Sequence, residues 1–381
     1  VPNSTDKGNV IRNVPHLRFP EFEGEWNLSK ISDVLSIGNG RDYKNLAKGD
    51  IPVFGTGGYM TSVSDYLYDG ETAFIGRKGT INKPYFYKGK FWTVDTLFYT
   101  HSFNGVTPHF VYCLFQTINW LRYNEASGVP SLSKDTIEKI KVHIPQIEEQ
   151  QKISLLLFLL DERIATQNKI IDKLQTLIRG IMVELQKQGL KNGTWKKFIL
   201  ADVLSERSEL NINLHQVFSV SVSKGVVNQV EYLGRSFSAK DTSKYHVVHY
   251  GDIVYTKSPT GSFPYGIVKQ SLNHDNVAVS PLYGVYKPKN FSTGMFLHQY
   301  FMSEVNTLNY LHPLIQKGAK NTINITNQRF LENRVAMPIN TDTLLVISQL
   351  LRSLNYKIEY QQSLLLQYQK QKQYLLRQMF I

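Results

Sequence analysis

The stretches VHIPQIEEQQKIS (142–154) and VAMPINTDTLLVIS (335–348) each run from a strand-like segment through a proline into the start of a helix. Aligning the two places Pro145 on Pro338, and just beyond the proline, with a shift of one residue, Ile153-Ser154 falls on Ile347-Ser348. Self-similarity over such a distance is the mark of an internal repeat. The sequence therefore predicts two copies of one structural unit.

The repeat continues upstream of the two prolines. WNLSKISDVLS from Trp26 resembles WKKFILADVLS from Trp195, sharing the Trp and the Asp-Val-Leu-Ser ending. Closer to the prolines, Ser133 falls on Thr326. Both copies thus begin and end alike.

The middle of the repeat is less regular. YDGETAFIGRKGT (68–80) pairs with HYGDIVYTKSPTG (249–261), each an apolar strand followed by a basic turn that contains glycine. A helix is expected after Thr107 and Pro108. Its apolar face is predicted to hold Phe110, Leu114, Ile118 and Leu121. Similar ends around different middles are expected when two domains share a scaffold but carry different surfaces.

After each proline, apolar residues recur with a spacing of four and three residues, which is the heptad pattern of a coiled coil. The first series is Ile153, Leu157, Leu160, Ile164, Gln167, Ile171, Leu174, Ile178, Ile181 and Leu185. The second is Ile347, Leu351, Leu354, Ile358, Gln361, Leu365, Tyr368, Lys372, Leu375 and Met379. A glutamine occupies the same place in both series, and such a polar residue can fix the register of two helices.

The predicted fold is mixed α/β (α+β), with two globular domains separated by two long helices and related by a pseudo-twofold internal repeat. Antiparallel packing of the helices into a coiled coil is expected, because the short stretch after Leu185 leads directly into the second globule. Roughly 35 helical residues make a spacer on the order of 50 Å. The expected divisions are a flexible N-terminal arm (1–18), a first globule (19–145), a central helix (146–190), a second globule (191–338) and a C-terminal helix (339–381).

Composition narrows the class of protein. The chain has 381 residues, of which 42% are hydrophobic, and a formal net charge of +12, which favours a polyanionic partner. Cys113 is the only cysteine, so the sequence offers no intramolecular disulfide and no cysteine-rich zinc site. Neither a signal peptide nor an apolar run of about 18 residues is visible, which predicts a cytoplasmic protein without membrane contact.

No catalytic motif is visible in the sequence. It has no glycine-rich dinucleotide fingerprint, no adenine-methyltransferase signature and no Walker A lysine motif, and its histidines do not have metal-ligand spacing. The glycines at 38–40 and 55–58 read as turns, and His143 reads as a scaffold residue on a strand. We therefore expect no catalytic residue, no cofactor and no metal in this chain.

A basic protein with two similar globules on a spacer is suited to duplex DNA that is read at two places. The candidate contacts lie in turns that mix cations, hydroxyls and glycines, because these groups bind phosphates and base edges. In the first globule they are Arg41, Tyr43, Lys44, Arg77, Lys78 and Thr80, and in the second they are Lys257, Ser258, Thr260, Ser262, Lys317, Lys320 and Asn321.

The stretch SGVPSLSKDTIEKIKVHIPQIEEQQKIS (127–154) resembles the specificity (S) subunits of type I restriction-modification systems, whose recognition domain ends in a Pro-x-x-x-Glu-Gln helix start. Four residues fit that motif: Pro145, Glu149, Gln150 and Ile153. The second copy keeps Pro338 but has Asn-Thr-Asp in place of Glu-Glu-Gln, so the contacts of the acidic helix start are not expected there. The resemblance covers nearly all of the chain after residue 16.

This resemblance implies that each globule is a target-recognition domain for one half of a bipartite duplex DNA target. The helices would set the spacing and bind two modification (M) subunits, and restriction (R) subunits would join the complex. Two alternatives remain at this point: a coiled-coil scaffold or adaptor without DNA specificity, and a self-sufficient methyltransferase or nuclease. An adaptor predicts no salt-sensitive DNA binding, and a self-sufficient enzyme requires a cofactor pocket.

Overall fold

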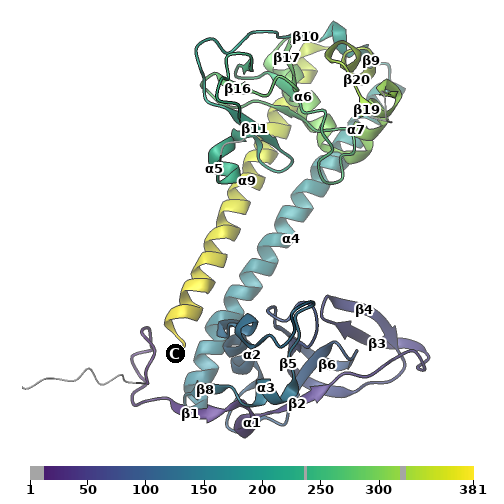
Figure 1. Cartoon of the computed structure of the whole chain (residues 1–381). Coiled ribbons are helices and arrows are strands. Elements are labelled where there is room, and N and C mark those ends of the chain that lie inside the picture. Colours follow the sequence, from purple (N-terminus) through teal and green to yellow (C-terminus); the bar gives the residue numbers. More distant parts are fainter. Residues whose placement is uncertain (1–12, 236–237, 318–322) are drawn as a thin grey trace, which may run out of the picture. The chain divides into compact units, whose positions relative to one another are not determined.

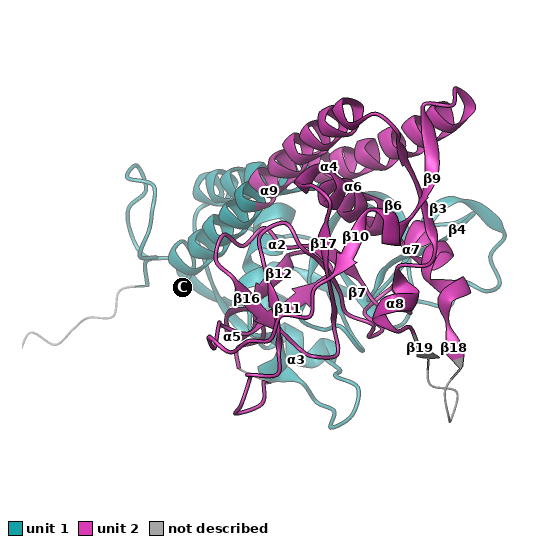
Figure 2. Cartoon of the chain, turned by 90° about the horizontal axis from the view of Figure 1, so that it is seen from above, with its two compact units in different colours: residues 1–168, 363–381 teal, residues 169–362 magenta. Residues whose placement is uncertain are grey.

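The structure is a computed structural model that describes residues 13–235, 238–317 and 323–381. The chain divides into two compact units with mixed α/β structure. Unit 1 comprises residues 1–168 and 363–381, and unit 2 comprises residues 169–362 (Figure 2). Two long helices, α4 (Ile147–Lys191) and α9 (Thr341–Gln378), each contribute to both units (Figure 1).

Unit 1 is built on a six-stranded sheet. Its strand order is β2 (Ser36–Asn39), β7 (Leu97–His101), β5 (Tyr68–Gly76), β6 (Tyr85–Thr93), β3 (Lys48–Gly55) and β4 (Gly58–Val63). All neighbours are antiparallel except β3 and β6, and a separate antiparallel pair joins β1 (Asn27–Lys30) to β8 (Lys141–Ile144). The helical elements are α1 (Ile31–Val34), α2 (Pro108–Thr117), η1 (Trp120–Tyr123) and α3 (Lys134–Glu138).

Unit 2 has a four-stranded antiparallel sheet in the order β10 (Leu204–Glu206), β17 (Gly284–Pro288), β14 (Ile253–Tyr255) and β15 (Val268–Gln270). Its strand pairs are β9 (Trp195–Ile199) with β20 (Arg334–Pro338), β11 (Phe218–Ser221) with β12 (Gly225–Asn228), β13 (His246–Val248) with β16 (Val277–Val279), and β18 (Gln316–Lys317) with β19 (Ile323–Asn324). The helical elements are η2 (Leu200–Asp202), α5 (Gln229–Leu233), α6 (Phe291–Met302), α7 (Glu304–Leu311), η3 (His312–Leu314) and α8 (Asn327–Phe330).

The two units share a framework. The antiparallel order β2-β7-β5-β6 of unit 1 corresponds to β10-β17-β14-β15 of unit 2, and the pair β1-β8 corresponds to β9-β20. What differs is the added structure. In unit 1 the hairpin β3-β4 extends the sheet beside β6, whereas unit 2 has the separate pairs β11-β12 and β13-β16.

Residues that match in the sequence repeat play the same local roles. The hydroxyl of Ser133 accepts a hydrogen bond from the Thr136 amide at the start of α3, and Thr326 does the same for Arg329 at the start of α8. Such caps satisfy an amide that a helix start otherwise leaves unbonded. Each copy therefore places a short capped helix just before its closing strand.

A buried tryptophan anchors each framework. Trp26 packs edge-on against Phe110 of α2, and Trp195 packs edge-on against Phe296 of α6. Large aromatic side chains bury much apolar surface, which makes them effective links between a strand pair and a helix. The repeated Trp at the start of each copy thus marks the same packing site.

Every residue of the two predicted heptad series is buried or half-buried in the structure. Within unit 1, Leu157 of α4 shares a hydrophobic core with Leu375 and Met379 of α9. Lys372 of α9 also donates to Asp161 of α4 over 2.6 Å. The early part of α4 therefore packs beside the late part of α9, which is antiparallel pairing inside this unit.

Among the described residues, no helix is long and apolar enough to cross a membrane.

The acidic start of α4 is tied to the N-terminal part of unit 1. The Glu149 side chain is fully buried and forms a bidentate pair with Arg18, with Nε–Oε1 and Nη2–Oε2 distances of 2.8 and 2.7 Å. The Trp26 indole also donates to Oε1. Losing one partner of a buried pair typically costs about 3 to 5 kcal/mol, because the other charge is left uncompensated. Arg18, the last residue of the predicted arm, thus has a defined structural partner.

The neighbouring Gln150 is also fully buried and links α4 to the loop before α2. Its amide oxygen accepts from the Thr107 backbone over 2.9 Å, and its amide nitrogen donates to the carbonyls of Gly105 and Pro145. Counted back from Ile347, which matches Ile153, the corresponding residue of α9 is Leu344, which is buried and apolar. The side-chain hydrogen bonds that Gln150 forms in the first copy therefore have no counterpart at this position of the second.

Candidate nucleic-acid interface

The turn after β5 holds three of the predicted contacts, Arg77, Lys78 and Thr80. The backbone amides of Arg77 and Lys78 both donate to the Thr96 carbonyl, over 2.8 and 3.3 Å. The Arg77 guanidinium donates to the carbonyl of Asp95 and lies 5.9 Å from the centre of the Phe98 ring. The turn is thus fixed to the connection between β6 and β7.

The loop after β2 is fixed to the same connection. The Arg41 amide donates to the Thr93 carbonyl over 2.8 Å, and the Trp92 indole donates to the Arg41 carbonyl over 2.8 Å. Because β2 and β5 both pair antiparallel with β7, they run in the same direction and end at the same edge of the sheet. The structure therefore brings the Arg41 and Arg77 loops together around residues 93–96.

Glycine is required at this edge because the backbones approach closely. A Cβ on Gly40 would lie 1.9 Å from the Val94 carbonyl oxygen, and one on Gly76 would lie 2.3 Å from the Thr80 carbonyl oxygen. Both distances are far below van der Waals contact. At Gly40 the close neighbour is distant in the sequence, whereas at Gly76 it belongs to the same turn.

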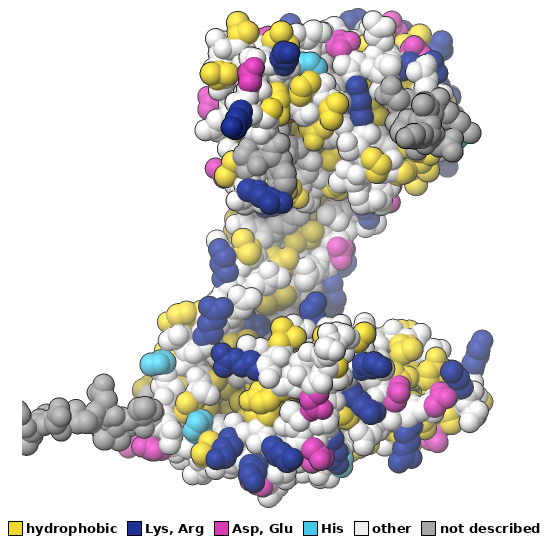
Figure 3. Space-filling model, viewed as in Figure 1, with side chains coloured by type: hydrophobic (Ala, Val, Ile, Leu, Met, Phe, Trp, Pro, Cys, Tyr) yellow, Lys and Arg dark blue, Asp and Glu magenta, His cyan; other side chains and the backbone are white. Residues whose placement is uncertain are grey.

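The cations of these loops are exposed and available. Arg41, Lys44, Arg77 and Lys78 have exposed side chains, and in the described part of the chain none of them takes part in a salt bridge. Tyr43 differs, because its half-buried ring packs against a small core next to β3 and β4. Figure 3 shows dark-blue Lys and Arg side chains spread over the visible face of unit 1. The edge thus presents positive charge that no internal carboxylate neutralises.

In unit 2 the loop that follows β14 corresponds to this turn. Lys257 is half-buried and has a φ of 61°, in the left-handed region that non-glycine residues seldom adopt. Burial lowers the pKa of its ammonium, and the nearby Glu206 carboxylate partly opposes that effect. Strained backbone of this kind concentrates at functional sites.

The rest of this loop forms a compact turn. Thr260 and Phe263 exchange backbone hydrogen bonds of 3.0 Å, and the Thr260 hydroxyl donates to the Ser258 carbonyl over 3.2 Å. The Ser262 hydroxyl donates to the Glu304 carboxylate, so it is already engaged within the protein. Ser258 remains exposed.

The third predicted group is only partly visible. Lys317 ends the short strand β18, whereas Lys320 and Asn321 lie outside the described residues. Their contribution to the interface stays a prediction.

One surface feature near the edge was missed in the sequence. The hairpin of β3 and β4 exposes Tyr59 by 64% and Met60 by 51%, and the neighbouring Thr56 lies against Gly76 and Gly79 of the Arg77 turn. A two-stranded ribbon of this kind fits the major groove of DNA. The Gly-Thr-Gly-Gly motif (55–58) predicts a turn, but it does not indicate that the aromatic residue beside it is exposed.

Comparison with known proteins gives this geometry a context. Residues 23–176 match the family described as "Type I restriction modification DNA specificity domain". The matched segment comprises 154 of the 381 residues. The resemblance expected from the sequence is therefore confirmed, and the matched segment contains both loops of the unit 1 edge together with the first two thirds of α4.

Curated relatives carry the same designation. The chain is 26% identical over 107 residues to the type I restriction enzyme EcoprrI specificity subunit of Escherichia coli, a segment that covers 28% of this chain and 27% of that relative. It is 27% identical over 144 residues to the MjaVIII specificity subunit of Methanocaldococcus jannaschii, covering 36% and 31%. The matched segments thus span about three tenths of these relatives.

The fold is similar over the whole chain to a solved structure. The crystal structure of the type I restriction-modification S subunit from M. genitalium superimposes with a TM-score of 0.69. The match covers 97% of this chain and 99% of that one, at 11% sequence identity. The solved S subunit thus has the same mixed α/β fold with a long helix, which is consistent with the family match of residues 23–176.

Proposed function

We propose that this chain is the DNA-specificity subunit of a type I restriction-modification complex and that its two globules each read one half of a bipartite duplex target. One observation carries the proposal: the same strand framework occurs twice, with different loops and unneutralised cations after the matching strands β5 and β14. A shared scaffold with different loops is how recognition domains vary specificity while keeping their fold. The proposed recognition domains are residues 19–145 and 191–338.

In this proposal, α4 and α9 form an antiparallel coiled coil that sets the distance between the half-sites. The burial of both heptad series supports it, as does the Asp161–Lys372 pair within unit 1. Each helix has a glutamine at the same seam position, Gln167 and Gln361. Register fixed in this way would keep the spacing constant.

The outward faces of the helices are proposed to bind two methyltransferase (M) subunits, and restriction (R) subunits to join through them. Apolar side chains are exposed there: on α4, Leu155 by 57% and Leu159 by 53%, and on α9, Val346 by 63% and Tyr360 by 62%. Exposed apolar surface of this extent on a protein is typical of an interaction site. The partner is inferred from the family.

The chain itself is proposed to be non-catalytic and to work in the cytoplasm. Sequence reasoning found no cofactor motif, and the described residues include no group of His, Cys, Asp or Glu that could hold a metal ion. The methyl transfer and the DNA cleavage would belong to the partners. An adaptor without DNA specificity is the alternative, and it predicts no dependence of DNA binding on the loop cations.

Reversing the charge of Arg77 together with Lys78 is expected to weaken binding of duplex DNA by roughly 10- to 100-fold. The slope of log Kd against the logarithm of the salt concentration should fall by about two, roughly one for each lost phosphate contact. Fluorescence anisotropy with a labelled duplex over a series of salt concentrations measures both quantities. Assembly with the methyltransferase should not change, because the turn lies away from the helices' exposed apolar residues in sequence and contact.

A matched control is the reversal of Lys30 with Lys139, two exposed lysines of unit 1 outside this edge. The control has the same change in net charge, so it separates local contact from general attraction. It should weaken binding by no more than about threefold. Equal behaviour of the two variants would show that the Arg77 turn faces solvent in the complex.

A further inference from the structure

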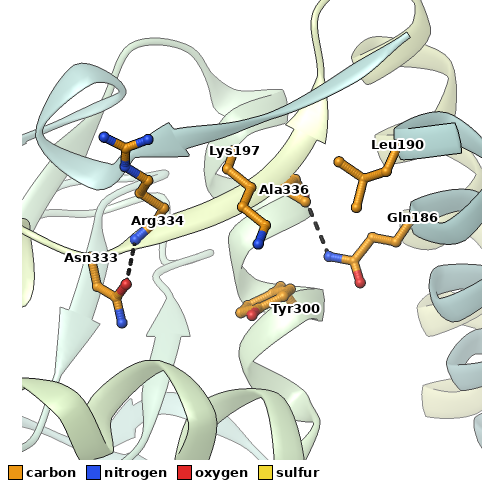
Figure 4. Close-up of a pocket in the computed structure, with 7 residues that line it drawn as sticks. All are labelled: Gln186, Leu190, Lys197, Tyr300, Asn333, Arg334 and Ala336. Atoms are coloured by element: carbon orange, nitrogen blue, oxygen red, sulfur yellow. Dashed lines mark hydrogen bonds between the residues drawn. The ribbon is translucent and has the colours of Figure 1, made fainter. Parts of the chain in front are cut away.

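A cavity of about 390 Å³ lies in unit 2, beside the strand pair β9-β20. Its walls come from the last turns of α4, from both strands and from α6. The lining residues, all labelled in Figure 4, are Gln186, Leu190, Lys197, Tyr300, Asn333, Arg334 and Ala336. None of these lining residues belongs to the loops that hold the predicted DNA contacts.

The charge in this cavity is entirely positive. Lys197 and Arg334 line it, no Asp or Glu does, and within the described ranges neither cation forms a salt bridge. The Tyr300 hydroxyl likewise has no hydrogen-bond partner among the residues that the structure describes. The Lys197 ammonium extends into the cavity and Arg334 lies at its rim, so an anion bound in the cavity would be attracted by both charges.

The strand register places the two cations close together. Lys197 lies directly opposite Ala336, and Arg334 is two residues before Ala336 on the same strand. Such diagonal positions share one face, with Cβ atoms about 7 to 8 Å apart. In Figure 4 the Lys197 ammonium extends toward Tyr300, whereas the Arg334 guanidinium is turned outward at the rim. The Arg334 side chain is exposed and forms no hydrogen bond or salt bridge with the residues that the structure describes, so it is free to turn inward.

The framework of unit 1 does not repeat this charge. Its corresponding strand pair has Leu28 opposite His143 where unit 2 has Lys197 opposite Ala336. Leu28 is exposed by 56%, so an apolar residue is tolerated at this place. The lysine is therefore not needed to build the scaffold, and it belongs to the surface that distinguishes unit 2.

The helix that follows the cavity wall contacts the proposed DNA loop of unit 2. Tyr300 belongs to α6, and the next helix, α7, begins at Glu304, whose carboxylate accepts the hydroxyl of Ser262. The loop that contains Lys257 and Ser262 is thus bonded to the helix next in sequence to the one that supplies Tyr300.

We propose that this cavity binds a backbone phosphate of duplex DNA, next to the half-site read by unit 2. A phosphate group has several oxygens that can accept at once from an ammonium, a guanidinium, a phenol and an amide, and these are the donor types that line the cavity. The inference rests on the proposed function, since it assumes that unit 2 faces DNA. It adds a positioning contact that carries no sequence information.

The test compares the full chain with the variant Lys197→Ala/Arg334→Ala in binding a labelled duplex. The expected result is a salt slope smaller by about 1.8 and an affinity lower by roughly 10-fold at about 100 mM salt. The matched control, Lys287→Ala/Lys289→Ala, removes two exposed lysines of unit 2 outside the cavity, and its slope should change by less than about 0.5. Thermal unfolding of each variant checks that the fold is kept, and Gln replaces Ala if it is not.

A second experiment measures the binding of inorganic phosphate to the full chain and to the double variant by calorimetry. Saturable phosphate binding that the double variant loses, together with an unchanged duplex slope, would assign the cavity to free phosphate and overturn the DNA contact. An unchanged slope with weakened methyltransferase assembly would assign it to a protein partner, which also overturns the inference. If duplex binding, phosphate binding and methyltransferase assembly are all unchanged in the double variant, the cavity is not a binding site, and the inference is wrong.

The reversal Lys257→Glu distinguishes this inference from the proposed function. If it weakens duplex binding while the Lys197/Arg334 variant does not, only the phosphate site is wrong. If neither weakens binding, unit 2 does not contact DNA, and both proposals for this unit fail.

Discussion

Replacing residues 19–145 by the corresponding domain of another specificity subunit is expected to change one half of the methylated sequence completely and to leave the other half unchanged. The reason is that the two units share a framework but carry separate loops. Each set of loops then reads its own half-site. Sequencing of methylated bases in cells that carry the hybrid with its methyltransferase subunit measures the result.

The structure shows what the exchanged domain must preserve. Gln150, which stays in the recipient, bonds to the backbones of Gly105 and Thr107 in the replaced part, and Glu149 bonds to Trp26. A donor with its own tryptophan and the same loop length before the helix keeps these contacts. As a control, a donor domain that reads the same half-sequence should leave the whole target unchanged. A change in both halves would contradict modular recognition.

Inserting one heptad into each long helix, for example after Leu174 and after Tyr368, is expected to lengthen the unspecified gap of the target. Both insertions keep the buried seam in phase and add about 10 Å of helix. That length corresponds to roughly three base pairs. Three base pairs also rotate the distant half-site by about 100°, so the realised change is expected to be three base pairs or fewer. The two half-sequences should stay the same.

The control for this experiment is an insertion of five residues in one helix, which breaks the phase of the seam. It turns apolar residues outward and should weaken folding or assembly. Methylated-base sequencing of the in-phase variant decides the question. An active complex with the original gap would exclude the two helices as the spacing element.

Local signals in the sequence predicted local structure well. Ser133 and Thr326 were matched by alignment alone, and both cap short helices, because capping depends on a few neighbouring residues. The seams of α4 and α9 followed from periodicity, which reports directly on the buried face of a helix. The helix after Thr107 begins as predicted, but it ends at Thr117, so Ile118 and Leu121 both lie beyond it, and Leu121 is 55% exposed.

Features that depend on strand order could not be read from the sequence. The Arg41 and Arg77 loops meet because β2 and β5 are both neighbours of β7, and no spacing along the chain reports that arrangement. The requirement for glycine at Gly40 has the same origin, since it reflects the approach of this backbone to Val94 in a distant segment. The positive cavity of Lys197 was missed because its residues are separated in the sequence and follow no motif.

A chain that reads two separate half-sites should leave a bipartite pattern of DNA methylation in the cell. Sequencing of methylated adenines in DNA from cells that carry this chain together with its methyltransferase subunit reveals that pattern, with cells lacking this chain as the reference. We expect one methylated sequence made of two specific parts, separated by a gap of unspecified bases of constant length. Methylation that does not depend on this chain, or a single uninterrupted target, would contradict it.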